Sequence, residues 1–279
     1  MVGRHLGVLG FPISGSKSPA IHAAAYRELG LNWEYARYEV NTEDFYHFVE
    51  DHSELSAMSL TMPLKSVGYE YALGHGGRID HVASQLQSVN TIVRDQAKLL
   101  AYNTDAYGVT EALRTAEVPQ PSTLAILGSG ATSRSVLLGA HTYFKGFDRV
   151  TVFSRNSDAA AATLRLLNDI APGVEGQWLP LEAAADFGGA DLTCNTLPTE
   201  VASQIEVDVP FSDGWMFDVN YSPWPSQLSL GWPEQNRISG LEMLLNQALA
   251  QVRIFVNGDP RQELPNEGHV FAAMRAACS

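Results

Sequence analysis

Apolar and polar positions alternate along the first hundred residues in a way that predicts short strands separated by helices. Apolar runs bounded by turn residues indicate strands, whereas apolar positions three and four residues apart indicate helices. Alternation of the two predicts a mainly parallel sheet covered by helices. The expected strands are 6–9, 33–40, 57–60, 91–93 and 99–101, and the expected helices are 19–29, 42–50 and one beginning at Pro63.

A second set of elements begins near Asp105, where a polar cluster opens another helix. The segment 123–127 is fully apolar and runs into a glycine-containing turn. The chain is therefore expected to be an α/β protein of two lobes. The further expected strands are 150–153, 191–194 and 215–219, and the further expected helices are 134–143 and 240–256.

The length of the chain is consistent with two lobes, and its net charge excludes some classes of partner. A chain of 279 residues is long enough for two lobes. It carries 31 acidic and 18 basic residues, a net charge of −13. Nucleic acids and anionic membranes attract clustered Lys and Arg, so we expect neither as a partner. An anionic ligand would have to be attracted by local groups.

Cysteine usage and hydropathy indicate a cytoplasmic protein. Cys194 and Cys278 are too few for a disulfide framework, and Cys194 lies in an apolar strand pattern typical of a core residue. The N-terminus lacks the pattern of a secretory signal. No apolar run approaches the roughly 20 residues of a membrane span. The sequence is compatible with either a monomer or a homodimer.

The turn after residues 123–127 has the layout of a dinucleotide site. A strand, a glycine turn and a helix place backbone N–H groups and a helix N-terminus against a pyrophosphate. Gly128 and Gly130 fill two of the three fingerprint positions, and Ser133 holds the third. The strand before the turn and the helix after it strengthen this interpretation.

The end of the following strand indicates NADP rather than NAD. NAD sites usually carry an acidic residue there, which binds the ribose hydroxyls. This chain has Ser154 and Arg155 and no carboxylate at that point. A guanidinium suits a 2′-phosphate. The alternative is an exposed loop arginine, but the glycine turn upstream favours NADP.

Two serines precede the first helix and could bind a carboxylate. Ser16 and Ser18 present two hydroxyls beside a helix N-terminus, just after a strand. The alternative is a well-capped helix, with Ser18 as N-cap and Pro19 at the first helical position.

Lys65 stands in the first turn of the helix that begins at Pro63, where the helix dipole disfavours a cation. Asp105 lies where a strand passes into a helix, so the two residues could form a pair that moves a proton. The alternatives are a solvated lysine and an aspartate that caps its helix. Helix position favours the neutral amine and Asp105 favours the ammonium, so the sequence leaves the protonation state open.

Ordered blocks through nearly the whole chain resemble the shikimate dehydrogenase family. No single block is decisive, but their joint order is highly specific. The blocks are 7–13 with 16–19, 60–65, 88–91, 103–105, 128–130, 154–156, 221–225 and 240–248.

The resemblance implies NADP-dependent oxidation of shikimate to 3-dehydroshikimate, run physiologically in reverse for aromatic amino acid biosynthesis. It implies that Lys65 and Asp105 are the catalytic pair and that Ser16 and Ser18 bind the carboxylate. No metal is expected. The other implied substrate-binding residues are Thr61, Asn90, Tyr221 and Gln247. The implied cofactor contacts are Gly128, Ser129, Gly130, Ala131, Ser154, Arg155, Thr196 and Gly240.

The resemblance also implies how the chain is divided. Residues 1–104 would form an α/β substrate-binding lobe, and residues 105–238 a Rossmann-type, doubly wound NADP-binding lobe. Residues 239–279 would return as helices to the first lobe, and a cleft would lie between the lobes.

Some positions depart from the family pattern. Gly15 stands where a His is usual, Ser59 replaces an Asn, Leu60 replaces a Val, and Ala131 stands where a glycine is common. A quinate or quinate/shikimate dehydrogenase is the nearest alternative, although Ser18 and Arg155 favour shikimate and NADP. A catalytically silent nucleotide-binding relative is a second alternative, but it would be expected to lose Lys65 or Asp105.

Overall fold

The computed structural model describes residues 3–95, 98–185, 189–205 and 214–278, and the chain divides into two compact units. The first unit contains Met1–Thr104 and Gln247–Ser279, and the second contains Asp105–Asn246. Residues 239–246 group with the second unit in this division. The first unit thus takes its last elements from the end of the chain.

The first unit is built on a six-stranded sheet with the strand order β2-β1-β3-β5-β6-β4. Its strands are β1 (His5–Gly10), β2 (Glu34–Glu39), β3 (Leu55–Leu60), β4 (Arg78–Ile79), β5 (Thr91–Asp95) and β6 (Lys98–Tyr102). Its helices before residue 105 are α1 (Ser18–Glu28), α2 (Phe45–Asp51), α3 (Lys65–Gly74) and α4 (His81–Leu86).

The sheet of the first unit is mainly parallel, as the sequence pattern predicted, apart from one reversed strand. Strands β1, β2 and β3 run parallel, but β5 is antiparallel to both β3 and β6. Only two sequence positions separate the end of β5 from the start of β6, whereas a parallel crossover needs a dozen or more residues, so the two strands must be antiparallel. The reversal brings the start of β5 to the sheet edge where β1, β3 and β6 end.

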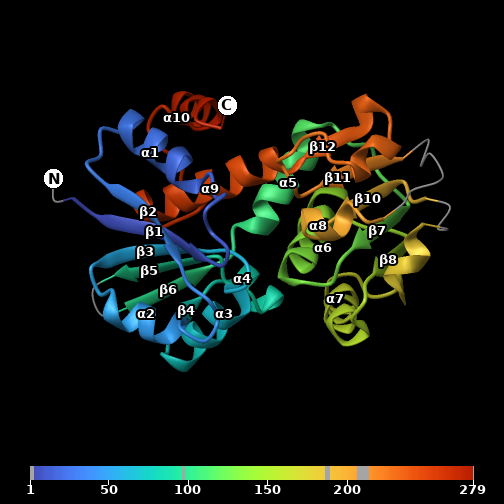
Figure 1. Cartoon of the computed structure of the whole chain (residues 1–279), viewed down its shortest axis with the longest axis horizontal. Coiled ribbons are helices and arrows are strands. Elements are labelled where there is room, and N and C mark those ends of the chain that lie inside the picture. Colours follow the sequence, from blue (N-terminus) through green and yellow to red (C-terminus); the bar gives the residue numbers. More distant parts are fainter. Residues whose placement is uncertain (1–2, 96–97, 186–188, 206–213, 279) are drawn as a thin grey trace. The chain divides into compact units, whose positions relative to one another are not determined.

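Helices cover both faces of this sheet (Figure 1). Helices α2 and α3 pack on one face, with Phe45, Val49 and Tyr71 buried against Met58 and Ile92. Helix α1, α10 (Glu267–Ala276) and the last part of α9 (Gly240–Asn257) lie toward the other face. Arg253 binds Glu267 through two hydrogen bonds, Nε–Oε2 at 2.8 Å and Nη2–Oε1 at 2.5 Å, and so ties α9 to α10.

The second unit contains a six-stranded, fully parallel sheet with the order β12-β11-β10-β7-β8-β9. Counted along the chain from β7, this is the 3-2-1-4-5-6 order of a doubly wound dinucleotide-binding fold. The strands are β7 (Thr123–Leu127), β8 (Arg149–Phe153), β9 (Glu175–Leu179), β10 (Leu192–Asn195), β11 (Trp215–Asp218) and β12 (Arg237–Ser239). The helices are α5 (Asp105–Thr115), α6 (Ala131–Phe144), α7 (Ser157–Ile170) and α8 (Thr199–Ala202).

Side chains of alternate strand positions fill the two faces of the second sheet. Ala125 and Leu127 join a core cluster with Ala202 and Trp232 on one side. On the other side α6 packs against both α5 and α7. Cys194 is fully buried within this unit, as the apolar pattern predicted, and burial raises the pKa of its thiol. Among the described residues, no helix is long and apolar enough to span a membrane.

Candidate active site

Predicted substrate residues of the first unit gather at one edge of its sheet. Ser16 and Ser18 follow β1, Thr61 follows β3, and Asn90 immediately precedes the reversed strand β5. The register pairs Ser59 with Thr91 and Thr91 with Tyr102, so the end of β6 reaches the same edge. The carboxyl ends of strands in an α/β sheet are the usual place for a ligand.

The serine segment differs from prediction at its cap. Lys17, rather than Ser18, holds the N-cap position of α1, and Ser18 is the first helical residue. Lys17 already has helical backbone angles, and its carbonyl accepts the N–H of Ile21 at 3.2 Å. The Oγ of Ser16 accepts the backbone N–H of Ser18 at 3.3 Å, and Arg37 donates two hydrogen bonds to the Ser16 carbonyl. The N-cap residue makes no capping bond with its side chain, and the Ser16 hydroxyl oxygen instead accepts the first N–H of α1.

Lys65 lies in the first turn of α3, as predicted, but Pro63 is not the first helical residue. Leu64 is the N-cap and Lys65 opens the helix. The N–H of Leu64 bonds to the Thr61 carbonyl at 2.7 Å, so 61–64 form a turn before the helix. The first helical bond then runs from Gly68 to Leu64 at 2.8 Å. The half-buried Lys65 thus sits directly beyond the edge where β3 ends.

Thr61 is held against β1 because Gly10 carries no side chain. A Cβ on Gly10 would collide with the Thr61 methyl group. The backbone N–H of Thr61 donates to the Leu9 carbonyl at 2.9 Å, and Phe11 donates to the Met62 carbonyl at 2.9 Å. Close approach of the two segments therefore places Thr61 beside the loop that leads to Ser16.

Hydrogen bonds join Asn90 to Gln247 through Thr104. The Asn90 amide nitrogen donates to the Thr104 hydroxyl at 2.9 Å, and Asn90 Oδ1 accepts the Thr104 N–H at 3.0 Å. The Thr104 hydroxyl donates to Gln247 Oε1 at 3.5 Å. Asn90 is 1% exposed, and its role in binding the substrate stays a prediction. Thr104 lies in the family block 103–105, but its role as the bridge was not predicted from the sequence.

Asp105 is the first residue of α5 and is 4% exposed. It belongs to the second unit, whereas Lys65 belongs to the first. Asp105 follows Thr104 directly, so the chain leaves the first unit beside the Asn90–Gln247 cluster. The pairing of Lys65 with Asp105 stays a prediction.

The turn after β7 has the geometry that a pyrophosphate site needs. Gly128 has φ +107°, and a Cβ there would collide with the Thr196 hydroxyl. Gly130 is the extended N-cap of α6, and a Cβ built on it meets nothing within 4 Å. Ser129 is half-buried and Ala131 is the first residue of α6. The open space at the start of α6 fits an anion held by backbone N–H groups.

Ser133, in the third fingerprint position, is fully buried and used within the protein. Its Oγ lies 2.7 Å from Thr196 Oγ1, which in turn donates to the Leu127 carbonyl at 2.8 Å. Thr196 follows β10, the neighbour of β7, so these bonds tie the two strands where the strand order reverses. This switch point is where doubly wound sheets bind dinucleotides.

The end of β8 presents an arginine to solvent. Ser154 is buried and donates to the Asn156 carbonyl at 2.9 Å, while the Trp178 indole donates to the Ser154 carbonyl at 3.2 Å. Asn156 caps α7 by accepting the N–H of Ala159 at 3.0 Å. Arg155 stands exposed between these anchored residues. A guanidinium beside a helix N-terminus fits a phosphate group.

The remaining predicted residues lie near the ends of β11 and β12. Gly240 is the first residue of α9, and a Cβ there would collide with the Val219 carbonyl. Tyr221 is half-buried in the loop after β11. This loop is anchored by the fully buried Asp218, whose oxygens accept from Asn195 at 2.9 Å and from Ser226 at 2.6 Å.

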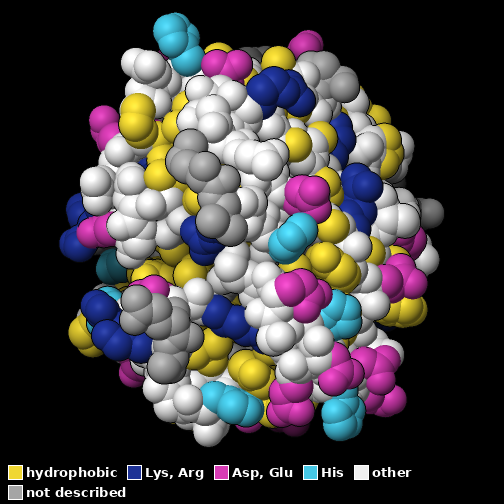
Figure 2. All heavy atoms as spheres, turned by 90° about the vertical axis from the view of Figure 1, so that its left-hand side faces the viewer, with side chains coloured by type: hydrophobic (Ala, Val, Ile, Leu, Met, Phe, Trp, Pro, Cys, Tyr) yellow, Lys and Arg dark blue, Asp and Glu magenta, His cyan; other side chains and the backbone are white. Residues whose placement is uncertain are grey.

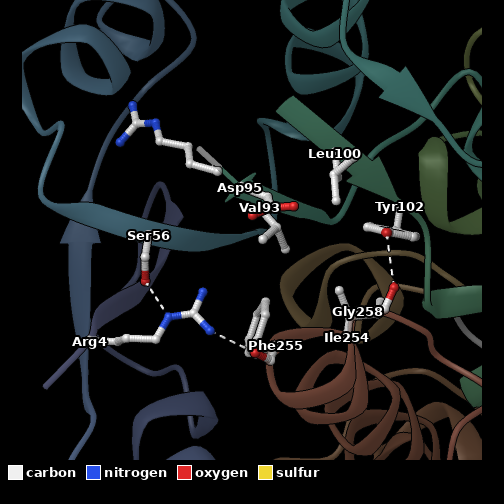
Figure 3. A pocket seen from close by; sticks show the side chains of 10 residues that line it. Arg4, Ser56, Val93, Asp95, Leu100, Tyr102, Ile254, Phe255 and Gly258 are labelled. Atoms are coloured by element: carbon white, nitrogen blue, oxygen red, sulfur yellow. Dashed lines mark hydrogen bonds between the residues drawn. The ribbon is translucent and has the colours of Figure 1, made fainter. Parts of the chain in front are cut away.

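A separate pocket of about 400 Å³ lies in the first unit between the sheet and α9 (Figure 3). Arg4 in this pocket donates to Ser56 at 3.0 Å and to the Phe255 carbonyl at 2.7 Å. Arg94 donates to three backbone carbonyls, those of Val49, His52 and Leu55. Both guanidinium groups therefore hold backbone in place, and none of the predicted site residues lines this pocket.

The strand order of the second sheet places the protein in the class of doubly wound, dinucleotide-binding folds. The sequence profile described as "Shikimate dehydrogenase substrate binding domain" matches residues 8–92. The crystal structure of Mycobacterium tuberculosis shikimate dehydrogenase is 32% identical, covers 98% of this chain and 99% of its own, and superposes with a TM-score of 0.78. The chain belongs to the shikimate dehydrogenase family.

Other relatives agree over the full length. The NADP-dependent shikimate dehydrogenase of Geobacter sp. strain M21 is 29% identical over 98% of this chain and 95% of its own length. A Thermus thermophilus shikimate 5-dehydrogenase, solved with NADP(H) and shikimate, is 27% identical. It covers 98% of this chain and 99% of its own, with a TM-score of 0.72.

Proposed function

We propose that this chain is an NADP-dependent shikimate dehydrogenase, which reversibly reduces 3-dehydroshikimate to shikimate in aromatic amino acid biosynthesis. The observation that carries this function is the convergence of Asn90, Thr104 and Gln247 at the sheet edge that also carries Lys65. The end-to-end likeness to shikimate dehydrogenases supports it.

The cofactor site is proposed at the switch point of the second sheet. Backbone N–H groups of Gly128, Ser129, Gly130 and Ala131 would bind the pyrophosphate, and Ser154 and Arg155 the 2′-phosphate. Thr196 and Gly240 would complete the site. When bound, NADP supplies the acceptor for a hydride from the carbinol carbon of the substrate.

Lys65 is proposed as the group that moves the proton. A hydroxyl proton must leave as the carbinol carbon is oxidised, and a positioned base for this step is usually worth about 10²–10⁴-fold in rate. Lys65 Nζ would accept this proton in oxidation and return it in reduction. Asp105 would orient the amine and bind a substrate hydroxyl.

The substrate contacts follow from the same edge of the first sheet. Ser16 and Ser18 would bind the carboxylate at the start of α1, and Tyr221 would line the pocket. Thr61, Asn90 and Gln247 would bind the hydroxyls. Because a buried polar group left unpaired is costly, such contacts discriminate against substrates with a missing or displaced hydroxyl.

Quinate is the alternative substrate, because Gly15 and Ser59 depart from the family pattern near the predicted substrate residues. Ser18 and Arg155 favour shikimate and NADP over quinate and NAD. Lys65 and Asp105 are both present, which opposes a silent nucleotide-binding role. We place the enzyme in the cytoplasm, as a monomer or a homodimer.

The test is to incubate the purified protein with shikimate, quinate or 3-dehydroshikimate and each nicotinamide cofactor, and to identify the products. We expect 3-dehydroshikimate from shikimate with NADP, and much slower turnover with quinate or NAD. A preference for quinate would assign the alternative enzyme. Tight NADPH binding without turnover of any of the three would assign the silent role.

A further inference from the structure

A second buried chain of hydrogen bonds leads to Asn90 from Tyr35 on β2 by way of Gln251 on α9. The Tyr35 hydroxyl donates to Ser59 Oγ at 2.6 Å, and Ser59 Oγ donates to Gln251 Oε1 at 3.0 Å. The Gln251 amide nitrogen then donates to the Asn90 carbonyl at 3.2 Å and to Thr91 Oγ1 at 2.9 Å. These bonds join β2, β3, α9 and the start of β5.

The orientation of the Gln251 amide fixes the direction of every bond that follows. A threonine hydroxyl has one hydrogen, so Thr91, which accepts from Gln251, is left to donate elsewhere. It donates to Asn90 Oδ1 at 2.8 Å. If position 251 offered only acceptors, the Thr91 hydrogen would turn to position 251 and Asn90 Oδ1 would lose this donor.

Because these side chains are buried, a change in the direction of their hydrogen bonds is unfavourable. Gln251 is 2% exposed, Ser59 4%, Asn90 1% and Thr91 0%. Water therefore has little access to replace a lost partner, and an unsatisfied buried polar group is unfavourable. Asn90 Oδ1 accepts a second hydrogen bond, from the Thr104 N–H at 3.0 Å. The Thr91 hydroxyl and the Thr104 N–H together therefore set the orientation of the Asn90 amide.

We propose that Gln251 is a positioning residue for substrate recognition, which sets the orientation of the Asn90 amide through Thr91. This role rests on the proposed function, because Asn90 binds a substrate hydroxyl only if shikimate is the substrate. Ser59, where the family usually has Asn, serves here as the donor that fixes the Gln251 amide. Specificity for the hydroxyls thus depends on residues behind the site as well as on those within it.

Gln251→Glu tests this role with almost no change in shape. An ionised carboxylate at position 251 accepts only, so Thr91 should turn its hydrogen away from Asn90. At a pH high enough to ionise the introduced carboxyl group, we expect the KM for shikimate to rise by about tenfold or more while the KM for NADP stays within about twofold. Gln262→Glu, the same change at an exposed position, is the matched control and should alter neither.

A pH profile separates positioning from a general loss of structure. Once protonated, the introduced carboxyl group again has one donor and one acceptor, and burial favours this neutral form. The KM for shikimate in Gln251→Glu should therefore fall toward the wild-type value as the pH is lowered. Gln251→Met, which has similar length and no N–H or O–H donor, should show no recovery. Equal profiles for the two variants would overturn the role.

A double-mutant cycle and a spectroscopic measurement complete the test. In an Asn90→Ala background, Gln251→Glu should raise the KM further by less than about twofold, because coupled residues are non-additive. The side-chain amide resonances of Asn90, identified by their loss in Asn90→Ala, should shift in Gln251→Glu. Full additivity, or unshifted Asn90 resonances, would overturn the role of Gln251.

The two proposals fail in different ways. A wild-type protein that turns over shikimate, beside a Gln251→Glu variant with unchanged KM, would refute the positioning role alone. A wild-type protein without turnover would refute the proposed function, and the Asn90 resonances would then decide whether Gln251 orients the amide. If Gln251→Glu does not fold, Ser59→Ala, which removes the donor to Gln251, should change the KM and the resonances in the same direction.

Discussion

Lys65 and Arg155 are the two side chains on which the proposed chemistry depends most. Lys65 opens α3 at the sheet edge, where the helix dipole disfavours a cation. Arg155 stands exposed between two anchored residues at the end of β8. The residue types and their positions could be predicted from the sequence. A cation in a first helical turn and an arginine after the second strand of a Rossmann fold are both local features.

Replacing Lys65 with Ala should reduce turnover of shikimate by about 10²-fold or more, because the proton would lose its acceptor. The dissociation constant for NADP should stay near the wild-type value, since Lys65 belongs to the first unit and the glycine turn to the second. Steady-state kinetics and a binding titration measure the two effects. Lys98→Ala, at an exposed lysine, is the control and should leave turnover unchanged. Turnover at the wild-type rate in Lys65→Ala would show that Lys65 does not take part in catalysis.

Replacing Arg155 with Ala should raise the KM for NADP by about tenfold or more and the KM for NAD much less, because only NADP carries the 2′-phosphate. Arg149→Ala, at the other end of β8 where Arg149 binds Glu175 at 2.9 Å, is the matched control. An equal rise for both cofactors would contradict the 2′-phosphate contact.

Several elements were predictable and several were not. The apolar run at 123–127 predicted β7, the polar cluster at Asp105 predicted the start of α5, and apolar positions at helical spacing predicted α9 from residue 240. The two-residue strand β4 and the six-residue helix α4 are too short to leave a periodic pattern, and they were missed. The direction of β5 also lies outside a single-strand pattern, because pairing depends on residues far apart in sequence. The Tyr35–Ser59–Gln251 chain was missed for the same reason.

The glycine turn offers a test with a built-in control. Gly128→Ala should lower the free energy of unfolding of the second unit by about 1–3 kcal/mol, because φ is +107° and the new methyl group meets Thr196. Gly130→Ala should leave stability nearly unchanged, since its φ is −77° and the space around it is open. Urea unfolding measures both, and equal stability of the two variants would contradict this geometry.

Helix α1 carries a buried histidine that should make the first unit sensitive to acid. His22 stacks on Tyr35 with a centroid distance of 4.0 Å and donates through Nδ1 to the Ser18 carbonyl at 2.9 Å. Burial lowers its pKa from 6.5 to about 4. Between these values the unfolded chain binds a proton that the folded chain does not, so stability is fully present above pH 6.5 and falls as the pH drops toward 4.

The expected loss is roughly 3 kcal/mol over that range, from about 1.4 kcal/mol per pKa unit. Urea unfolding of the wild type and of His22→Phe at several pH values measures it. The variant keeps an aromatic ring against Tyr35 but cannot be protonated, so its stability should depend less on pH. His81→Gln, at an exposed histidine, is the control. If the free energy of unfolding depends on pH equally in the wild type and in His22→Phe, His22 does not cause the effect.

At the scale of the whole molecule, the net charge of −13 repels an anionic substrate. On the face shown in Figure 2, Asp and Glu side chains gather at the lower right, and Lys and Arg are dispersed. Shikimate and NADP are both anions, so in the proposed function their binding would depend on local groups, for which we propose Ser16, Ser18, Arg155 and the start of α6. Full-length likeness to the family, rather than overall charge, is what identifies the partners.

The initial rate of NADPH formation by the purified protein with shikimate and NADP tests the proposed function most directly. A rate proportional to enzyme concentration is predicted, at least about tenfold above the rates with quinate or with NAD in place of NADP. Absence of NADPH formation from shikimate, in protein shown to be folded and to bind NADPH, would contradict the function proposed for this chain.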